Sequence, residues 1–86
     1  MTPPQVQGKG TGKLAENILH FARTLRAAGL PGGPGAVLDA VQAVEAVGIG
    51  TRTDFFATLH AVFVKRHEQT PIFRQAFDIF WKKRGF

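Results

Sequence analysis

The chain has 86 residues, of which 44% are hydrophobic, and it carries a formal net charge of +5 at pH 7. Its eight Phe suffice for the core of one small domain, and the absence of Cys excludes disulfides and thiolate metal sites, which fits a cytoplasmic protein. No apolar run approaches the ~20 residues that a membrane-spanning helix needs.

Residues 1–12 combine Gly, Pro and polar residues without periodicity, so we expect a flexible tail. A phosphate-loop interpretation of Gly8–Lys13 fails on spacing, because Gln7 stands where the Walker motif needs Gly and Leu14 where it needs Ser or Thr. Residues 13–84 are therefore expected to form a single helical domain.

The first helix is predicted over residues 13–28, where apolar residues recur at three- and four-residue steps. This apolar stripe consists of Leu14, Ile18, Phe21, Ala22, Leu25 and Ala28. Gly29 can adopt the left-handed conformation that ends a helix, and Leu30 is placed to fold back on Leu25 in a Schellman motif. Pro31 prevents the helix from resuming. These residues predict a tight corner.

A second helix is predicted over residues 34–47, with Pro34 at its first position and Gly48 as its stop. We expect Ile49 to cover Val44 beyond that stop. The face expected to be buried consists of Val37, Leu38, Val41, Val44 and Val47.

A third helix is predicted over residues 52–66. Thr51 is its expected N-cap, and Asp54 lies three residues further on, as in a capping box. The expected buried face consists of Phe55, Phe56, Leu59, Val62 and Phe63.

The fourth helix, predicted over residues 71–83 with Thr70 as N-cap and Pro71 in its first turn, is unusually apolar. Its core stripe consists of Phe73, Ala76, Phe77 and Phe80, and Ile72, Ile79 and Trp81 widen this stripe beyond a normal core face. Either the helix lies at the centre of the bundle, or these three residues face outward and bind a partner, with weak homodimerisation of the isolated chain. We favour the second alternative.

No strand pattern is found, so the predicted fold is all-α: four short helices in a compact bundle with tight Gly/Pro corners. The segment Gly48–Gly50 could be the turn of a helix-turn-helix, and a small basic nucleic-acid-binding domain is the alternative function. The helix after this turn offers only Arg52 near its start, and the basic residues are scattered over the chain. A solvated basic surface is the favoured interpretation.

Arg23 and Arg26 lie on the first helix shortly before the corner. Arg26 falls in the last turn, where a cation is favoured by the helix dipole, so a structural role is the first interpretation. The functional alternative is that the guanidinium groups bind carboxylates of a partner. Both arginines are therefore candidate partner-binding residues.

The residues that usually carry catalysis or bind metals are scarce. The chain has no Ser, Cys or Tyr, which removes the commonest nucleophiles, and we do not expect an enzyme. His20, His60 and His67 show no ligand spacing with one another or with acids on a shared helix. No metal ion or cofactor is expected.

Four segments, taken in order and spacing, resemble the N-terminal region of CoxE-type proteins over about residues 17–81. They are Phe21–Pro34, Val37–Ala40, Asp54–Leu59 and Phe73–Trp81. CoxE-type proteins carry a von Willebrand factor A domain and are accessory factors named from the carbon monoxide dehydrogenase system.

The resemblance implies a non-catalytic adaptor or scaffold. Its implied partners are a downstream von Willebrand factor A domain and a MoxR-type AAA+ ATPase, in the best-known case for maturing a molybdenum- and copper-containing dehydrogenase. The family's metal-ion-dependent adhesion motif, Asp-x-Ser-x-Ser, lies in the von Willebrand domain, so no metal ligand carries over to this chain. By this resemblance, residues 13–84 are either the N-terminal part of a longer protein, which we favour, or a stand-alone remnant of one.

Overall fold

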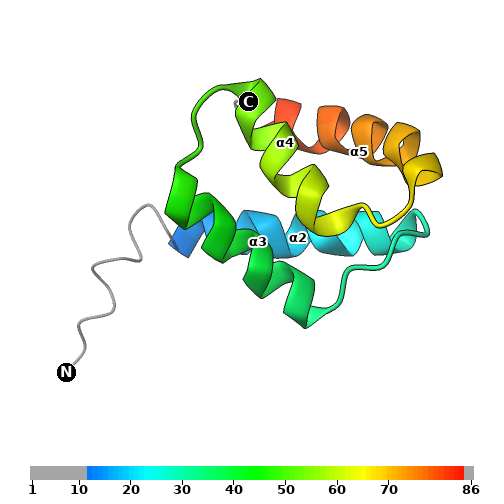
Figure 1. Ribbon diagram of the computed structural model, residues 1–86, viewed down its shortest axis with the longest axis horizontal. Coiled ribbons are helices and arrows are strands. Elements are labelled where there is room, and N and C mark those ends of the chain that lie inside the picture. Colours follow the sequence, from blue (N-terminus) through cyan, green and yellow to red (C-terminus); the bar gives the residue numbers. More distant parts are fainter. Residues whose placement is uncertain (1–11, 85–86) are drawn as a thin grey trace.

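The computed structural model of the protein describes residues 12–84 (Figure 1). The elements are α2 (Lys13–Ala27), α3 (Pro34–Val47), α4 (Arg52–Phe63), the short 3-10 helix η2 (His67–Gln69) and α5 (Thr70–Lys82). The described residues contain no strand, and the predicted all-α fold of four helices is confirmed. The predicted tail falls, apart from Gly12, outside the described residues. Within residues 12–84, no helix has the length and apolarity needed to cross a membrane.

The four helices enclose one core. α2 and α5 lie side by side and run in opposite directions, and α4 crosses this pair obliquely (Figure 1). α3 contacts both α2 and α4, and α4 also contacts α5. By backbone proximity each helix therefore has two main neighbours, and the apolar stripes of all four meet inside this ring.

Phe21 of α2 lies at the centre of the core and is fully buried. Its ring lies 5.3–6.1 Å from five other rings, those of Phe63, Phe73, Phe77, Phe80 and Trp81. Most of these pairs are edge-on, the arrangement that aromatic quadrupoles favour. The core is thus built mainly from aromatic side chains of α2, α4 and α5.

The apolar faces of α2 and α4 largely follow the prediction, whereas α3 departs from it. In α3 the buried residues are Ala40 and Val44, while Leu38 is 57% exposed and Val47 is 69% exposed. Leu38 lies two residues before the buried Ala40, which places it about 200° around the helix, on the side away from the core. Val47 is the last helical residue. The predicted burial of Leu38 and Val47 is therefore wrong, because α3 is apolar on more than one side and its sequence singles out no face.

The corner after α2 has the predicted geometry. Gly29 has φ of 102°, the Leu30 N–H donates to the Leu25 carbonyl at 2.9 Å, and the Gly29 N–H donates to the Arg26 carbonyl at 3.0 Å. These are the two hydrogen bonds of a Schellman motif, and Leu30 is buried as that motif requires. Pro34 then begins α3, as predicted.

The capping box of α4 is also confirmed. The Asp54 N–H donates to Thr51 Oγ1 at 3.1 Å, and the Thr51 N–H donates to Asp54 Oδ2 at 3.4 Å. At the C-terminal end of α3, Gly48 has φ of 81°, the positive φ expected of the residue that ends the helix. Ile49 after it is half-buried and packs against the core.

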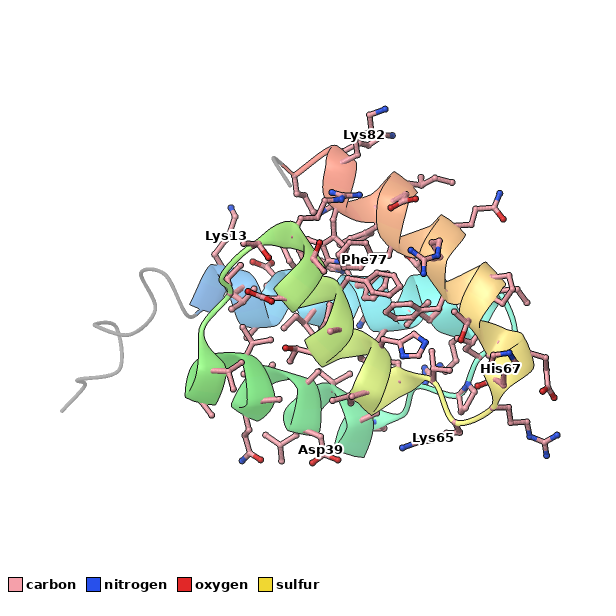
Figure 2. The ribbon with its side chains drawn as sticks, turned by 45° about the horizontal axis from the view of Figure 1, so that its top comes forward. Lys13, Asp39, Lys65, His67, Phe77 and Lys82 are labelled. Carbon is pink, nitrogen blue, oxygen red and sulfur yellow. The ribbon has the colours of Figure 1, made fainter. Side chains whose placement is uncertain are left out.

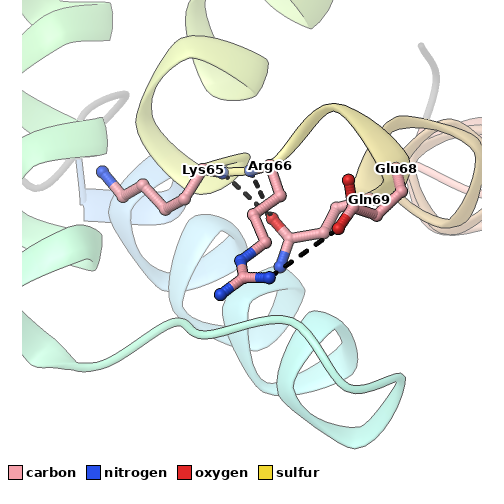
Figure 3. A network of polar contacts seen from close by, with 4 residues as sticks. All are labelled: Lys65, Arg66, Glu68 and Gln69. Atoms are coloured by element: carbon pink, nitrogen blue, oxygen red, sulfur yellow. Dashed lines mark hydrogen bonds and ion pairs between the residues drawn. The ribbon is translucent and has the colours of Figure 1, made fainter.

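α4 ends at Phe63, three residues earlier than predicted, because a side chain takes over the next backbone donors. Gln69 Oε1 accepts hydrogen bonds from the backbone N–H groups of Lys65, at 3.0 Å, and Arg66, at 3.1 Å (Figure 3). An exposed ion pair of 3.8 Å joins Arg66 and Glu68 in the same network. The connection to α5 is thus held in an extended form by hydrogen bonds that a continuous helix could not make.

Thr70 is the first residue of α5 and not its N-cap, so this part of the prediction is wrong. Its hydroxyl lies 2.9 Å from His60 Nε2 and hydrogen bonds with that ring, which ties the end of α4 to the start of α5. Pro71 lies in the first turn of α5, as predicted.

Candidate functional site

α5 buries one wide face and leaves one flank uncovered. Phe73 and Phe77 are buried, whereas Ile72 is 43% exposed and Ile79 is 60% exposed. The two isoleucines are seven residues apart, which places them on the same side of the helix about 10 Å from each other. The prediction that they face outward agrees with these exposures.

Trp81 does not belong to this outward flank. It is 1% exposed, and its ring lies 4.8 Å from that of Phe55 on α4. At 100° per residue Trp81 lies about 40° from Phe77 and on the opposite side of the stripe from Ile79. The prediction that Trp81 faces outward is wrong, because α4 covers the side of α5 on which it lies.

A groove between α2 and α5, called here the α2/α5 groove, runs along the uncovered flank and has a volume of about 380 Å³. Its apolar lining comes from Ala28, Ile72, Ala76, Ile79 and Phe80, and Thr24 and Gln75 add polar groups. Among the described residues that line it, none is acidic, and Lys83 and Arg84 make its charged end.

Arg84 is held in place at that end. Its guanidinium lies 3.7 Å from the centre of the Phe80 ring, and its Nη1 donates to the Phe80 carbonyl at 3.1 Å. A cation that stacks on a core ring and also bonds the backbone keeps its charge beside the groove. The α2/α5 groove is therefore apolar along its length and positive at one end.

A second groove, the α2/α3 groove, lies between those two helices and has a volume of about 650 Å³. Arg23 and Arg26 both line it, so the structure brings together the two arginines singled out from the sequence. The exposed Leu19 and Leu38 line it as well. Sequence reasoning missed this groove, because it placed Leu38 in the core and left Leu19 aside. The available signal was that Leu19 lies between Glu16 and Arg23 on the same side of α2.

The single basic residue near the start of α4 is engaged in the fold. Arg52 pairs with Asp78 of α5 at 2.8 Å, and its guanidinium lies 5.2 Å from the centre of the Phe77 ring. Phe77 points into the aromatic core, while Lys13, Asp39, Lys65, His67 and Lys82 lie at the periphery on different elements (Figure 2). The charges of the described residues thus surround the molecule and do not gather along α4.

The histidines do not form a site. Among residues 12–84 no group of three or more His, Cys, Asp or Glu side chains is arranged to hold a metal ion. His60 stacks against Phe56 at 5.6 Å in addition to its bond with Thr70, so its role in this fold is structural. His20 and His67 are exposed.

Comparison with known proteins gives one match. The family model of the CoxE N-terminal helical bundle domain matches residues 18–84, which cover most of the chain and all of its helices except the first turn and a half of α2. No curated protein and no solved structure matches the chain.

Proposed function

This chain belongs to the family of CoxE N-terminal helical bundle domains, and from this we propose that it acts as a non-catalytic docking domain that binds another protein through the α2/α5 groove. The family match supports an accessory domain of a CoxE-type protein. The choice of groove rests on the residues that line it.

The observation that carries this proposal is the contrast within α5. The helix buries its aromatic residues almost completely, yet it leaves Ile72 and Ile79 exposed on one flank beside Ala76 and Phe80. Apolar surface in water is unfavourable by ~25 cal/mol per Å², so a contiguous apolar groove of this kind is favourable to cover. A protein surface with apolar residues at its centre fits it.

The partners that we propose are those implied by the resemblance to CoxE-type proteins. They are the von Willebrand factor A domain of the same protein and a MoxR-type AAA+ ATPase, with the maturation of a metalloenzyme as the process served. A location in the reducing cytoplasm accords with a chain that contains no Cys.

The experiment is a calorimetric titration of the 86-residue chain against a purified MoxR-type ATPase and, separately, against a von Willebrand factor A domain of a CoxE-type protein. Ile79→Asp should weaken binding at least tenfold, because it places a carboxylate in the apolar part of the groove. Val47→Asp is the matched control, since Val47 is also exposed and also lies in the last turn of its helix. The docking role of this groove would be refuted if the two variants bound with equal affinity. It would also be refuted if neither the parent chain nor either variant bound.

The same pair of variants tests weak homodimerisation. In sedimentation, the parent chain is expected to self-associate through the exposed isoleucines, and Ile79→Asp is expected to be a folded monomer. Because Ile79 is 60% exposed, circular dichroism should show unchanged helix content in this variant.

Nucleic-acid binding is the alternative function, favoured by the net charge of +5. A titration with mixed-sequence duplex decides between the two, because binding driven by phosphate contacts weakens steeply as salt rises. Tight and strongly salt-dependent binding at ~0.15 M salt would replace the docking proposal.

A further inference from the structure

From its lining and charge, we infer that the α2/α3 groove binds an acidic amphipathic helix of a partner protein, with apolar side chains on its floor and carboxylates against Arg23 and Arg26. This inference deepens the proposed docking function and rests on it, but it concerns a different surface. The two grooves lie on opposite flanks of α2, because Thr24 of one and Arg26 of the other are about 200° apart around the helix. Occupation of one groove therefore leaves the other open.

The shape of the groove matches a short helix. Along α2 it extends from Ala15 to Arg26, twelve residues that span roughly 16 Å, which is about three helical turns. Its other wall is the start of α3, where Val37 and Val41 are half-buried. An apolar groove between two helices is a recurring binding site for the apolar face of a third, amphipathic helix.

The corner between α2 and α3 closes one end of the floor. Gly32 is buried and lines the groove, and a Cβ added there would lie 3.4 Å from the Ala22 carbonyl oxygen. At that distance a methyl group would make an ordinary van der Waals contact, so the corner packs against the backbone of α2 and joins the two walls of the groove. The floor is therefore continuous from α2 to α3, and Leu19 and Leu38 remain exposed at its edges.

The charge of the groove selects the partner. Arg23 and Arg26 are both exposed, and within residues 12–84 neither forms an ion pair. Glu16 is the acidic residue of the lining, and it lies seven residues before Arg23, about 10 Å away along α2. The end of the groove near the corner is thus positive, and guanidinium groups pair best with carboxylates.

A second copy of this chain is a poor occupant by the same argument. The exposed isoleucines of α5, which a second copy would offer, have Lys83 and Arg84 beside them and no acidic residue in the same lining, so they would bring cations toward Arg23 and Arg26. We expect a partner segment with two or more Asp or Glu near one end, which would pair with the arginines. Leu-type residues at positions i, i+4 and i+7 of the segment would contact the apolar lining of the groove.

The probe is a synthetic helical peptide of about three turns, with Leu at i, i+4 and i+7 and Glu on both flanks, added to the ¹⁵N-labelled 86-residue chain. We expect saturable amide shifts below ~1 mM peptide, confined to residues 15–26 and 35–41. The double variant Arg23→Glu/Arg26→Glu should weaken this binding at least tenfold, and Leu38→Asp should weaken it similarly.

A matched control is Arg74→Glu/Lys82→Glu, which changes the net charge by the same four units on α5, away from the lining of this groove. It should bind the peptide within about threefold of the parent chain, a difference below 1 kcal/mol. Ile79→Asp should also leave this binding unchanged.

Four outcomes would overturn the inference: no shifts at ~1 mM peptide, shifts centred on residues 72–84, equal binding of a peptide with Lys in place of Glu, or equal binding of a peptide with Gln in place of Leu. Saturable self-association of the chain that shifts residues 15–23 without peptide would also overturn it, in favour of a second copy. In each case the docking role of the α2/α5 groove is judged separately, from the Ile79→Asp titration.

Discussion

Replacing Phe21 with Ala should remove a large part of the stability of this domain. The Phe21 ring is fully buried and is the meeting point of five other rings, at centroid distances of 5.3–6.1 Å. These rings come from α4 and α5, so the substitution opens a cavity where three helices converge. No neighbouring side chain can fill it without leaving its own ring contacts.

The magnitude follows from the size of the cavity and of the domain. Phe→Ala changes in cores cost about 3–5 kcal/mol, from lost burial and the cavity left behind. A domain of this size has a total free energy of unfolding of about 4–11 kcal/mol, at 0.05–0.15 kcal/mol per residue. Phe21→Ala should therefore remove between about a quarter and all of the free energy of unfolding at 25 °C. Phe21→Leu should lose less because it keeps most of the apolar volume.

Urea unfolding followed by far-UV circular dichroism and by Trp81 fluorescence measures this loss. Leu38→Ala is the matched control, because Leu38 is 57% exposed and its truncation should cost less than about 1 kcal/mol. If Phe21→Ala lowers the free energy of unfolding by less than about 1.5 kcal/mol, the convergence of the rings on Phe21 does not hold the core together, and the argument fails.

Three further predictions concern helix ends and use the same unfolding assay. Gly29→Ala should destabilise the domain by about 1 kcal/mol, since φ is 102° there, whereas Gly35→Ala in α3 should stabilise it by about 0.5–1 kcal/mol; equal effects would contradict the left-handed stop. Thr51→Ala should cost about 1 kcal/mol through loss of the capping box, and Thr58→Ala, within the same helix, should cost less than half of that; the reverse order would show that Thr51 is not the cap. Gln69→Leu should cost about 1 kcal/mol because two backbone N–H groups lose their acceptor, and a neutral effect would mean that water replaces the amide without loss.

The two grooves give the α2 helix an unusual position in the fold. Its core face is covered by the aromatic rings, and each flank of that face borders a groove with exposed apolar residues and positive charge. A docking domain that uses both flanks could hold two segments without moving any helix. The variants Ile79→Asp and Arg23→Glu/Arg26→Glu separate the contributions of the two grooves.

Local sequence signals determined where most helices begin and end. The Schellman stop at Gly29, the proline start of α3 and the capping box at Thr51 were all predicted correctly. The stop and the box depend on hydrogen bonds between residues within five positions, and the start depends on the fixed φ of Pro34. The same signals failed at the end of α4. There the Gln69 side chain accepts hydrogen bonds from the backbone N–H groups of Lys65 and Arg66, four and three residues earlier, and no Gly or Pro marks the end of the helix in the sequence.

The all-α class and the aromatic core stripe of α5 also follow from the sequence, since helical periodicity survives in any packing arrangement. Which flank of a wide apolar helix is covered is a different matter, because it depends on where the neighbouring helices lie. The sequence predicted that Leu38 is buried and that Trp81 faces outward with Ile79, yet α4 covers Trp81 while Ile79 and Leu38 border grooves. The sequence alone determined the helices and most of their ends. Only the packing of α4 against α5 and of α3 against α2 decided which apolar and basic side chains remained exposed.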